Sequence, residues 1–249
     1  PVCGLSHKLQ SPRRWSLQKA RSGSVLAGAQ SYDNVIPVQF KRYDHVTLNW
    51  MKTKGSERGH LKQDFEKPRG QSEVDREVAQ LVTHDLPSDK AVLIWTFKQR
   101  EGEPDFRGRL LQALRDEDVD TRSKVTVGDT EKDRINVETF GRETSTNALK
   151  HCEYVIFTGG LEQDLDALAA SYLSEVRDIT AEATKEDIAA MNRGEVWHSV
   201  IQAMSRGAMR DVWVDEDGQS QAKPMAVYLM SSPLQVFRCL LRLAPRTFS

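Results

Sequence analysis

Apolar residues recur along the chain with two spacings, one typical of strands and one typical of helices. Alternating or continuous apolar runs predict strands, and apolar residues three or four positions apart predict amphipathic helices. Strands are predicted over residues 35–40, 46–51, 91–97, 124–127, 134–140, 153–158 and 226–230. Helices are predicted over residues 72–84, 105–116, 161–176, 185–209 and 234–243, with a helical turn over 147–152. Residues 52–70, rich in charge and glycine, predict a loop.

Strands that alternate with helices in this way predict an α/β fold with a mainly parallel sheet and helices on both of its faces. In such folds ligands meet the loops at the carboxyl ends of the strands. The loops of this kind span residues 96–100, 141–147 and 158–161.

Charge is divided unevenly along the chain. Its 249 residues carry a formal net charge of -1, yet residues 1–70 hold 13 Lys/Arg against 5 Asp/Glu, and the remainder hold 22 against 31. We therefore expect a flexible basic lead-in over residues 1–33, a strand pair with a charged loop over 34–70, and a folded domain over 71–249. The basic lead-in has the composition of a nucleic-acid contact and equally that of a solvated linker.

Several classes of protein do not fit the sequence. No apolar run approaches the roughly 20 residues of a membrane span, and no leader pattern is present, so we expect an intracellular, cytoplasmic protein without membrane contact. Cys3, Cys152 and Cys239 are isolated from one another, and the six histidines are scattered, so no disulfide framework and no metal site are expected. His151 and Cys152 are neighbours in sequence and are expected to point apart. The start at Pro1 suggests a piece of a longer protein.

The stretch from Gln202 to Arg210 carries the candidate chemistry. Gln202, Arg206 and Arg210 follow one another at intervals of four, which places them on one stripe of the predicted helix, opposite an apolar side that includes Met204. Two arginines one turn apart repel each other, so a phosphate or carboxylate in front of them would explain the arrangement. A solvated cationic face or a pair of internal salt bridges is the alternative.

Three blocks of sequence, residues 92–98, 138–147 and 202–210, stand in this order along the chain. Together they resemble motifs IV, V and VI of the second, C-terminal RecA-like lobe of superfamily 2 helicases. The third block resembles the pattern Gln-x-x-Gly-Arg-x-x-Arg, with Ser205 where glycine is common. The resemblance covers about residues 90–230 and implies a three-layer RecA-like domain.

The resemblance also implies roles for individual residues. Arg206 and Arg210 would be arginine fingers that reach the triphosphate, and Gln202 would position them or contact the nucleotide. Contacts to a DNA or RNA backbone would come from the first two blocks, through Thr96, Lys98, Arg142, Thr144, Thr146 and Asn147. Asn147 and Thr146 are equally suited to capping a helix, and Lys98 to standing in solvent at a strand end.

Two further parts of an ATP-driven helicase are absent from these residues. Neither a Gly-x-x-x-x-Gly-Lys-Ser/Thr phosphate loop nor an acidic strand-end motif for Mg²⁺ occurs. ATP and Mg²⁺ would be bound mainly by a Walker-containing lobe, upstream or on a separate chain, and this chain would be inactive alone. The alternative is a non-catalytic domain, derived from a helicase lobe, that binds nucleic acid or protein.

Overall fold

The computed structural model describes residues 13–16, 42–53, 56–65, 72–141, 147–160, 165–176, 180 and 184–231. The predicted strand at 35–40 and the predicted helix at 234–243 lie outside these residues, as do Arg142, Thr144 and Thr146.

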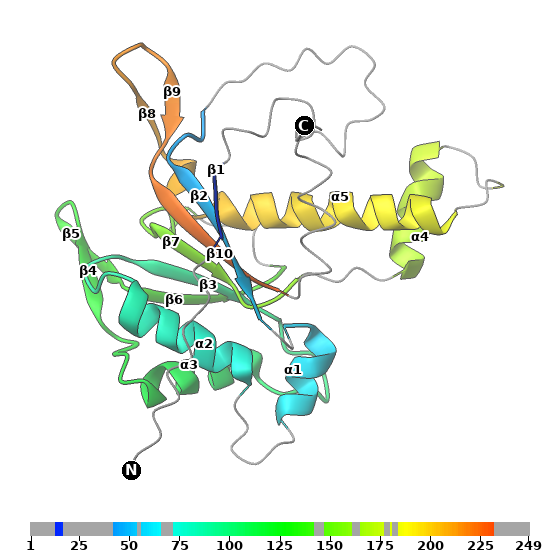
Figure 1. Ribbon diagram of the computed structural model, residues 1–249, viewed down its shortest axis with the longest axis horizontal. Coiled ribbons are helices and arrows are strands. Elements are labelled where there is room, and N and C mark those ends of the chain that lie inside the picture. Colours follow the sequence, from blue (N-terminus) through cyan, green and yellow to red (C-terminus); the bar gives the residue numbers. More distant parts are fainter. Residues whose placement is uncertain are drawn as a thin grey trace.

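A six-stranded sheet forms the centre of the molecule (Figure 1). Five of its strands are parallel to one another, and β1 pairs with β2 in the antiparallel sense. From one edge to the other, the strands are β1 (Arg13–Ser16), β2 (Val46–Lys52), β10 (Met225–Ser231), β7 (Tyr154–Phe157), β3 (Val92–Thr96) and β6 (Ile135–Thr139).

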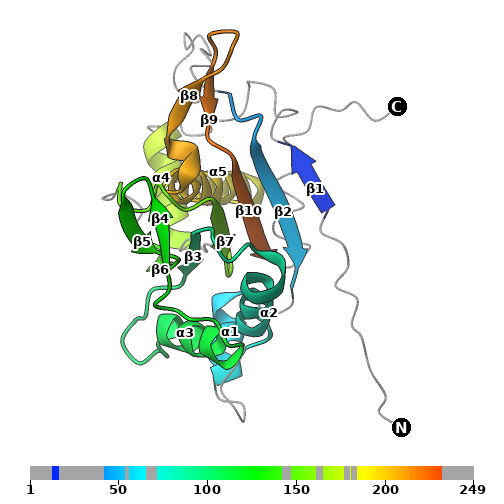
Figure 2. The same ribbon diagram turned by 90° about the vertical axis from the view of Figure 1, so that its left-hand side faces the viewer.

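Helices cover both faces of this sheet (Figures 1 and 2). The connection from β3 to β6 runs one way across the sheet and the connection from β7 to β10 runs the other way, so right-handed crossovers place their helices on opposite faces. The α/β prediction is confirmed. The helices are α1 (Arg58–Phe65), α2 (Glu73–Gln80) with a π-helical turn over Leu81–Asp85, α3 (Phe106–Asp116), α4 (Leu165–Val176) and α5 (Lys185–Met204).

Local sequence accounts for where these helices begin. Ser72 caps α2 by accepting a hydrogen bond from the Asp75 N–H, and Asp105 caps α3 by accepting one from the Gly108 N–H. Thr184 and Asp187 form a reciprocal capping box at the start of α5. The continuous apolar run of β3 is buried at every position, as expected of a parallel strand covered on both faces.

The amino-terminal third differs from its prediction. β2 lies between β1 and β10 inside the main sheet, so it is not an edge strand. Arg13–Ser16, in the segment expected to be irregular, form β1, and the predicted loop over 52–70 contains α1. Strand pairing between distant segments, which no local pattern encodes, explains the first two differences.

The strand predicted over 124–127 is confirmed as β4 (Lys124–Val127), but its pairing with β5 (Thr130–Asp133) was not predicted. The hairpin in which β8 (Val212–Val214) pairs with β9 (Ser220–Ala222) was missed altogether. β5 consists of four exposed polar residues and β8 of only three residues, so neither shows a recognisable period. The acidic stretch around Asp215 is the turn that joins β8 to β9.

A buried ion pair fastens the three helices α1, α2 and α3 together. The Asp75 carboxylate pairs with Nε of Arg109, and the two side chains are only 3% and 5% exposed. Arg109 also donates through Nη1 to the Leu61 carbonyl oxygen at 2.6 Å and through Nη2 to the Ser72 hydroxyl at 3.5 Å. Burial raises the pKa of Asp75, and the charge of Arg109 opposes that rise.

Replacing Asp75 with alanine should destabilise the fold strongly, because it leaves the Arg109 guanidinium buried without its counter-ion. We expect the free energy of unfolding in urea to fall by about 3–5 kcal/mol. The exposed Glu73 in the same helix is the control, and Glu73→Ala should cost less than about 1 kcal/mol. Equal losses in the two variants would contradict the assigned role of the pair.

Candidate functional site

Two ends of the parallel strands can carry chemistry: the end at which the strands finish, called the carboxyl edge, and the end at which they begin, called the amino edge. β3 and β7 are neighbours, but their outgoing connections run to opposite sides, which makes their carboxyl ends the topological switch point of the sheet. Gly159, just after β7, lies against the Ser56 carbonyl group and the ring of Phe97, which follows β3. The segment before α1 therefore packs onto the carboxyl edge beside the switch point.

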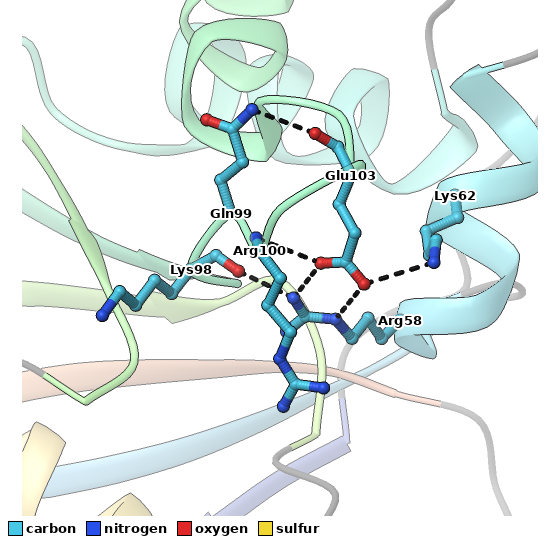
Figure 3. Close-up of polar contacts among 6 residues, drawn as sticks. All are labelled: Arg58, Lys62, Lys98, Gln99, Arg100 and Glu103. Carbon is cyan, nitrogen blue, oxygen red and sulfur yellow. Dashed lines mark hydrogen bonds and ion pairs between the residues drawn. The ribbon is translucent and has the colours of Figure 1, made fainter.

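Arg58 anchors the loop after β3 to α1 at this carboxyl edge (Figure 3). Its guanidinium donates to both carboxylate oxygens of Glu103, with Nε 3.3 Å from Oε1, and to the Lys98 carbonyl oxygen at 2.8 Å. It also lies 5.5 Å from the ring centroids of both Phe97 and Phe106. Charge, hydrogen bonds and aromatic contact thus hold this loop in one conformation.

Glu103 is the shared acceptor of this cationic cluster. Lys62 Nζ is 3.2 Å from one of its oxygens, and the Arg100 backbone N–H donates to the other at 3.3 Å. Hydrogen bonds from Arg58, followed by those from Lys62, lower the pKa of Glu103 to about 2 against the opposing effect of burial. The carboxylate therefore stays charged throughout the physiological range.

Of the residues expected to contact nucleic acid, the structure describes Thr96, Lys98 and Asn147, and these three do not gather at one place. Thr96 is only 2% exposed, so the fold does not present its hydroxyl at the surface. Lys98 is exposed at the carboxyl edge, and in Figure 3 its ammonium group points away from Glu103, as does the guanidinium of Arg100. Asn147 is exposed too, but it lies near the amino edge. It belongs to the same turn as His151, whose ring contacts the Asp133 carbonyl oxygen just before β6.

The arginine turn, residues 205–210, lies at the amino edge of the sheet, opposite the carboxyl edge. Gly207 packs where β7 and β10 begin, and a Cβ built on it would lie 2.8 Å from Met225 Sδ, 2.9 Å from Val155 Cγ2 and 3.1 Å from the Cys152 carbonyl oxygen. Its φ of -79° is open to any residue, so glycine is required here for space. The Ala208 N–H donates to the Cys152 carbonyl oxygen at 2.8 Å and fixes the turn to the sheet.

The predicted single helix through Met209 is wrong. α5 ends at Met204, Ser205 and Arg206 form a turn, and Ala208–Arg210 form one turn of 3-10 helix. Gln202, Arg206 and Arg210 are therefore not stacked on one helical stripe. The chain leaves the helical path after Met204 and packs Gly207 closely against Met225, Val155 and the Cys152 carbonyl oxygen.

The three residues differ in exposure. Arg206 is half-buried and Arg210 is exposed on the 3-10 turn. Gln202, in the last turn of α5, has its amide nitrogen 2.5 Å from Nε2 of His198, one turn earlier. Arg210 also follows Arg206 by four residues, one more than the pattern Gln-x-x-Gly-Arg-x-x-Arg allows, and the side chain at the pattern's own position, Met209, is buried.

Further cations meet beside this turn, and sequence reasoning did not find them. Asp211 lies 3.4 Å from Lys150 Nζ and 3.0 Å from Lys223 Nζ, so one carboxylate gathers two ammonium groups next to Arg210. Burial would raise the pKa of Asp211, but Lys223 and Lys150 outweigh it and lower that pKa. The two lysines are 73 residues apart in the sequence, and only the fold brings them together.

The neighbouring thiol does not supply a nucleophile. Cys152 and His151 were expected to point apart, yet the Cys152 sulfur lies 3.9 Å from Nε2 of His151. Burial raises the pKa of this thiol to about 12, so it stays protonated. Within the described ranges no group of three or more His, Cys, Asp or Glu side chains is arranged to hold a metal ion, and none of the described helices is both long and apolar enough to cross a membrane.

Comparison with known proteins adds one distant likeness. No protein-family model matches the chain, and no curated protein matches it. A solved structure described as an XPD helicase is similar, with a TM-score of 0.34 and 14% sequence identity, over 67% of this chain and 30% of that one. The chain thus spans about 30% of that structure's length. Its own strand pairing, and not this distant likeness to a helicase, establishes the α/β fold.

Replacing Gly207 with alanine should lift the arginine turn from the amino edge, because backbone and core atoms fill the space of a Cβ. We expect the free energy of unfolding to fall by about 1–3 kcal/mol in urea denaturation. Gly59 in α1 is the matched control, since a Cβ there meets nothing within 4 Å. Gly59→Ala should stabilise by about 0.4–1 kcal/mol, and a Gly207→Ala variant as stable as the parent would refute the assigned packing.

Protonation of Glu103 should weaken the attachment of the β3 loop to α1. The lowered pKa means that its contribution to stability is complete above the ordinary value of 4.5 and is lost as the pH falls toward about 2. The difference in unfolding free energy between the parent and Glu103→Gln should therefore be constant above about pH 5 and shrink below about pH 4.

The same urea titrations on Glu101→Gln, an exposed position of the same loop, provide the control. A parent-to-Glu103→Gln difference that keeps its full size at low pH would show that the charge of Glu103 does not hold the loop.

Proposed function

We propose that this chain is the C-terminal lobe of an ATP-dependent superfamily 2 helicase or translocase that acts on DNA or RNA. A companion lobe with the Walker motifs would bind ATP and Mg²⁺, and Arg206 and Arg210 would reach its triphosphate. Gln202 would support them from the end of α5. The chain alone would be inactive.

The attachment of the arginine turn to the sheet is the observation that carries this proposal. The connection from α5 to β10 is held on the sheet by the tight packing of Gly207 and the hydrogen bond from Ala208 to Cys152. Arg206 and Arg210 flank that fixed point on both sides. A catalytic group must be held in place before the reaction, and here the backbone that carries both guanidinium groups is held.

Guanidinium groups suit the chemistry proposed for them. Negative charge spreads over the γ-phosphate oxygens during phosphoryl transfer, and a planar, permanently charged group can stabilise it with two hydrogen bonds. Lys150 and Lys223 add positive charge beside Arg210, and the single carboxylate of Asp211 offsets only part of it. The amino edge is therefore suited to a polyphosphate.

Nucleic-acid contact would fall mainly at the other edge of the sheet. Lys98 stands there on a loop fixed by Arg58 and Glu103, and its ammonium group is available for a phosphate. Arg142, Thr144 and Thr146 remain in the proposed set although they lie outside the described residues, and Asn147 would contact the polymer from the amino edge. Thr96 would support the loop from inside the fold rather than touch the polymer.

Alanine at either arginine should abolish most of the ATPase activity. Combined with its Walker-containing lobe and single-stranded nucleic acid, the chain should hydrolyse ATP, and Arg206→Ala or Arg210→Ala should lower turnover by about 10³-fold or more. The exposed Arg107 of α3 is the control, and Arg107→Ala should leave turnover unchanged. Measured phosphate release under saturating ATP separates loss of catalysis from loss of binding.

Full turnover in both arginine variants would exclude the finger role. Salt-sensitive binding to single-stranded nucleic acid that persists in those variants, with no ATPase in any combination, would instead support a non-catalytic binding domain derived from a helicase lobe.

A further inference from the structure

The hairpin of β8 and β9 projects from the body of the molecule beyond the main sheet (Figures 1 and 2). All three residues of β8 are apolar and exposed: Val212 by 51%, Trp213 by 40% and Val214 by 64%. Exposed apolar side chains in a row on a strand are uncommon in a protein that works alone, because such a strand invites pairing with another chain.

The backbone of β8 offers an open edge on the side away from β9. The Asp215 N–H donates to the Gln219 carbonyl oxygen, and the Lys223 N–H donates to the Asp211 carbonyl oxygen. Because the backbone groups of successive residues point to opposite sides of a strand, those of Asp211, Trp213 and Asp215 point toward β9. The N–H and C=O groups of Val212 and Val214 therefore point outward. Within the described residues no backbone hydrogen bond joins them to another segment.

The opposite edge of the hairpin is already occupied. Arg42 lies beside β9, where its N–H donates to the Ser220 carbonyl oxygen at 2.7 Å and its own carbonyl oxygen accepts from the Ala222 N–H at 2.8 Å. Trp213, which points to the other face from the two valines, lies 5.9 Å from the ring of His45. The hairpin is thus held on one side and open on the other.

Charge around the hairpin indicates what would pair with it. The turn that follows β8 carries three carboxylates, Asp215, Glu216 and Asp217, and no lysine or arginine. A segment with basic residues at the end that meets the turn fits well.

We propose that β8 is a docking edge for an extended segment of another protein, with apolar side chains at alternate positions and lysine or arginine at the end beside the acidic turn. Backbone hydrogen bonds to Val212 and Val214 would supply one part of the affinity, and contact with their side chains the other. This docking is independent of nucleotide hydrolysis.

A random decapeptide library displayed on phage, selected against the full chain, tests the proposal. The enriched peptides should alternate apolar residues and carry Lys or Arg at one end. A synthetic peptide of the enriched sequence should bind at least about tenfold more weakly to Val214→Lys than to the parent in fluorescence anisotropy, and more weakly at high salt.

Val127→Lys is the matched control, since Val127 is 39% exposed on the other two-stranded hairpin, and it should leave affinity unchanged. Both replaced side chains are exposed, and circular dichroism checks that the variants fold. Selection of no peptide that depends on Val214 would overturn the proposal. Analytical ultracentrifugation that shows a dimer of the parent and a monomer of Val214→Lys would overturn it as well. The chain that pairs with β8 would then be a second copy of this one.

Discussion

The pairing of β10 with both β2 and β7 is the constraint on which the rest of the architecture depends. β10 pairs with β2 over seven residues and with β7 over four. It therefore joins β1 and β2 on one side of the sheet to β7, β3 and β6 on the other. Because β10 is parallel to β7, the chain must return from the carboxyl edge to the amino edge between them. α4 and α5 provide that return, and the turn with Arg206 therefore comes to lie at the amino edge.

This arrangement separates the candidate chemistry into two regions. Arg206, Arg210 and the lysines around Asp211 lie at the amino edge, whereas Lys98 and the Arg58 anchor lie at the carboxyl edge. Under the proposed function, a nucleotide at the amino edge and a nucleic acid at the carboxyl edge would contact opposite ends of the same parallel strands. The sheet between them would couple the two contacts.

Sequence patterns predicted the strands and helices with strong periods, and they failed where contacts between distant residues decide. The apolar run of β3 and the apolar spacing of α2 identified their elements directly. The position of β2 inside the sheet depends on β10, more than 170 residues later, and no local signal records it. The end of α5 was missed because the reason for it, the lack of room at Gly207, lies in Met225 and Val155. The Asp211 cluster went unseen for the same reason.

Hydrogen exchange of the Ala208 backbone amide tests the central claim most directly, namely that the arginine turn is fixed to the amino edge of the sheet. This N–H donates to the buried Cys152 carbonyl oxygen at 2.8 Å, and Ala208 is 3% exposed. Measured by NMR in the native protein, it should exchange only through large-scale unfolding, as slowly as the amides of β7. Exchange as fast as that of the exposed turn at Glu216 would show that the arginines are carried on a loose segment and would contradict the account.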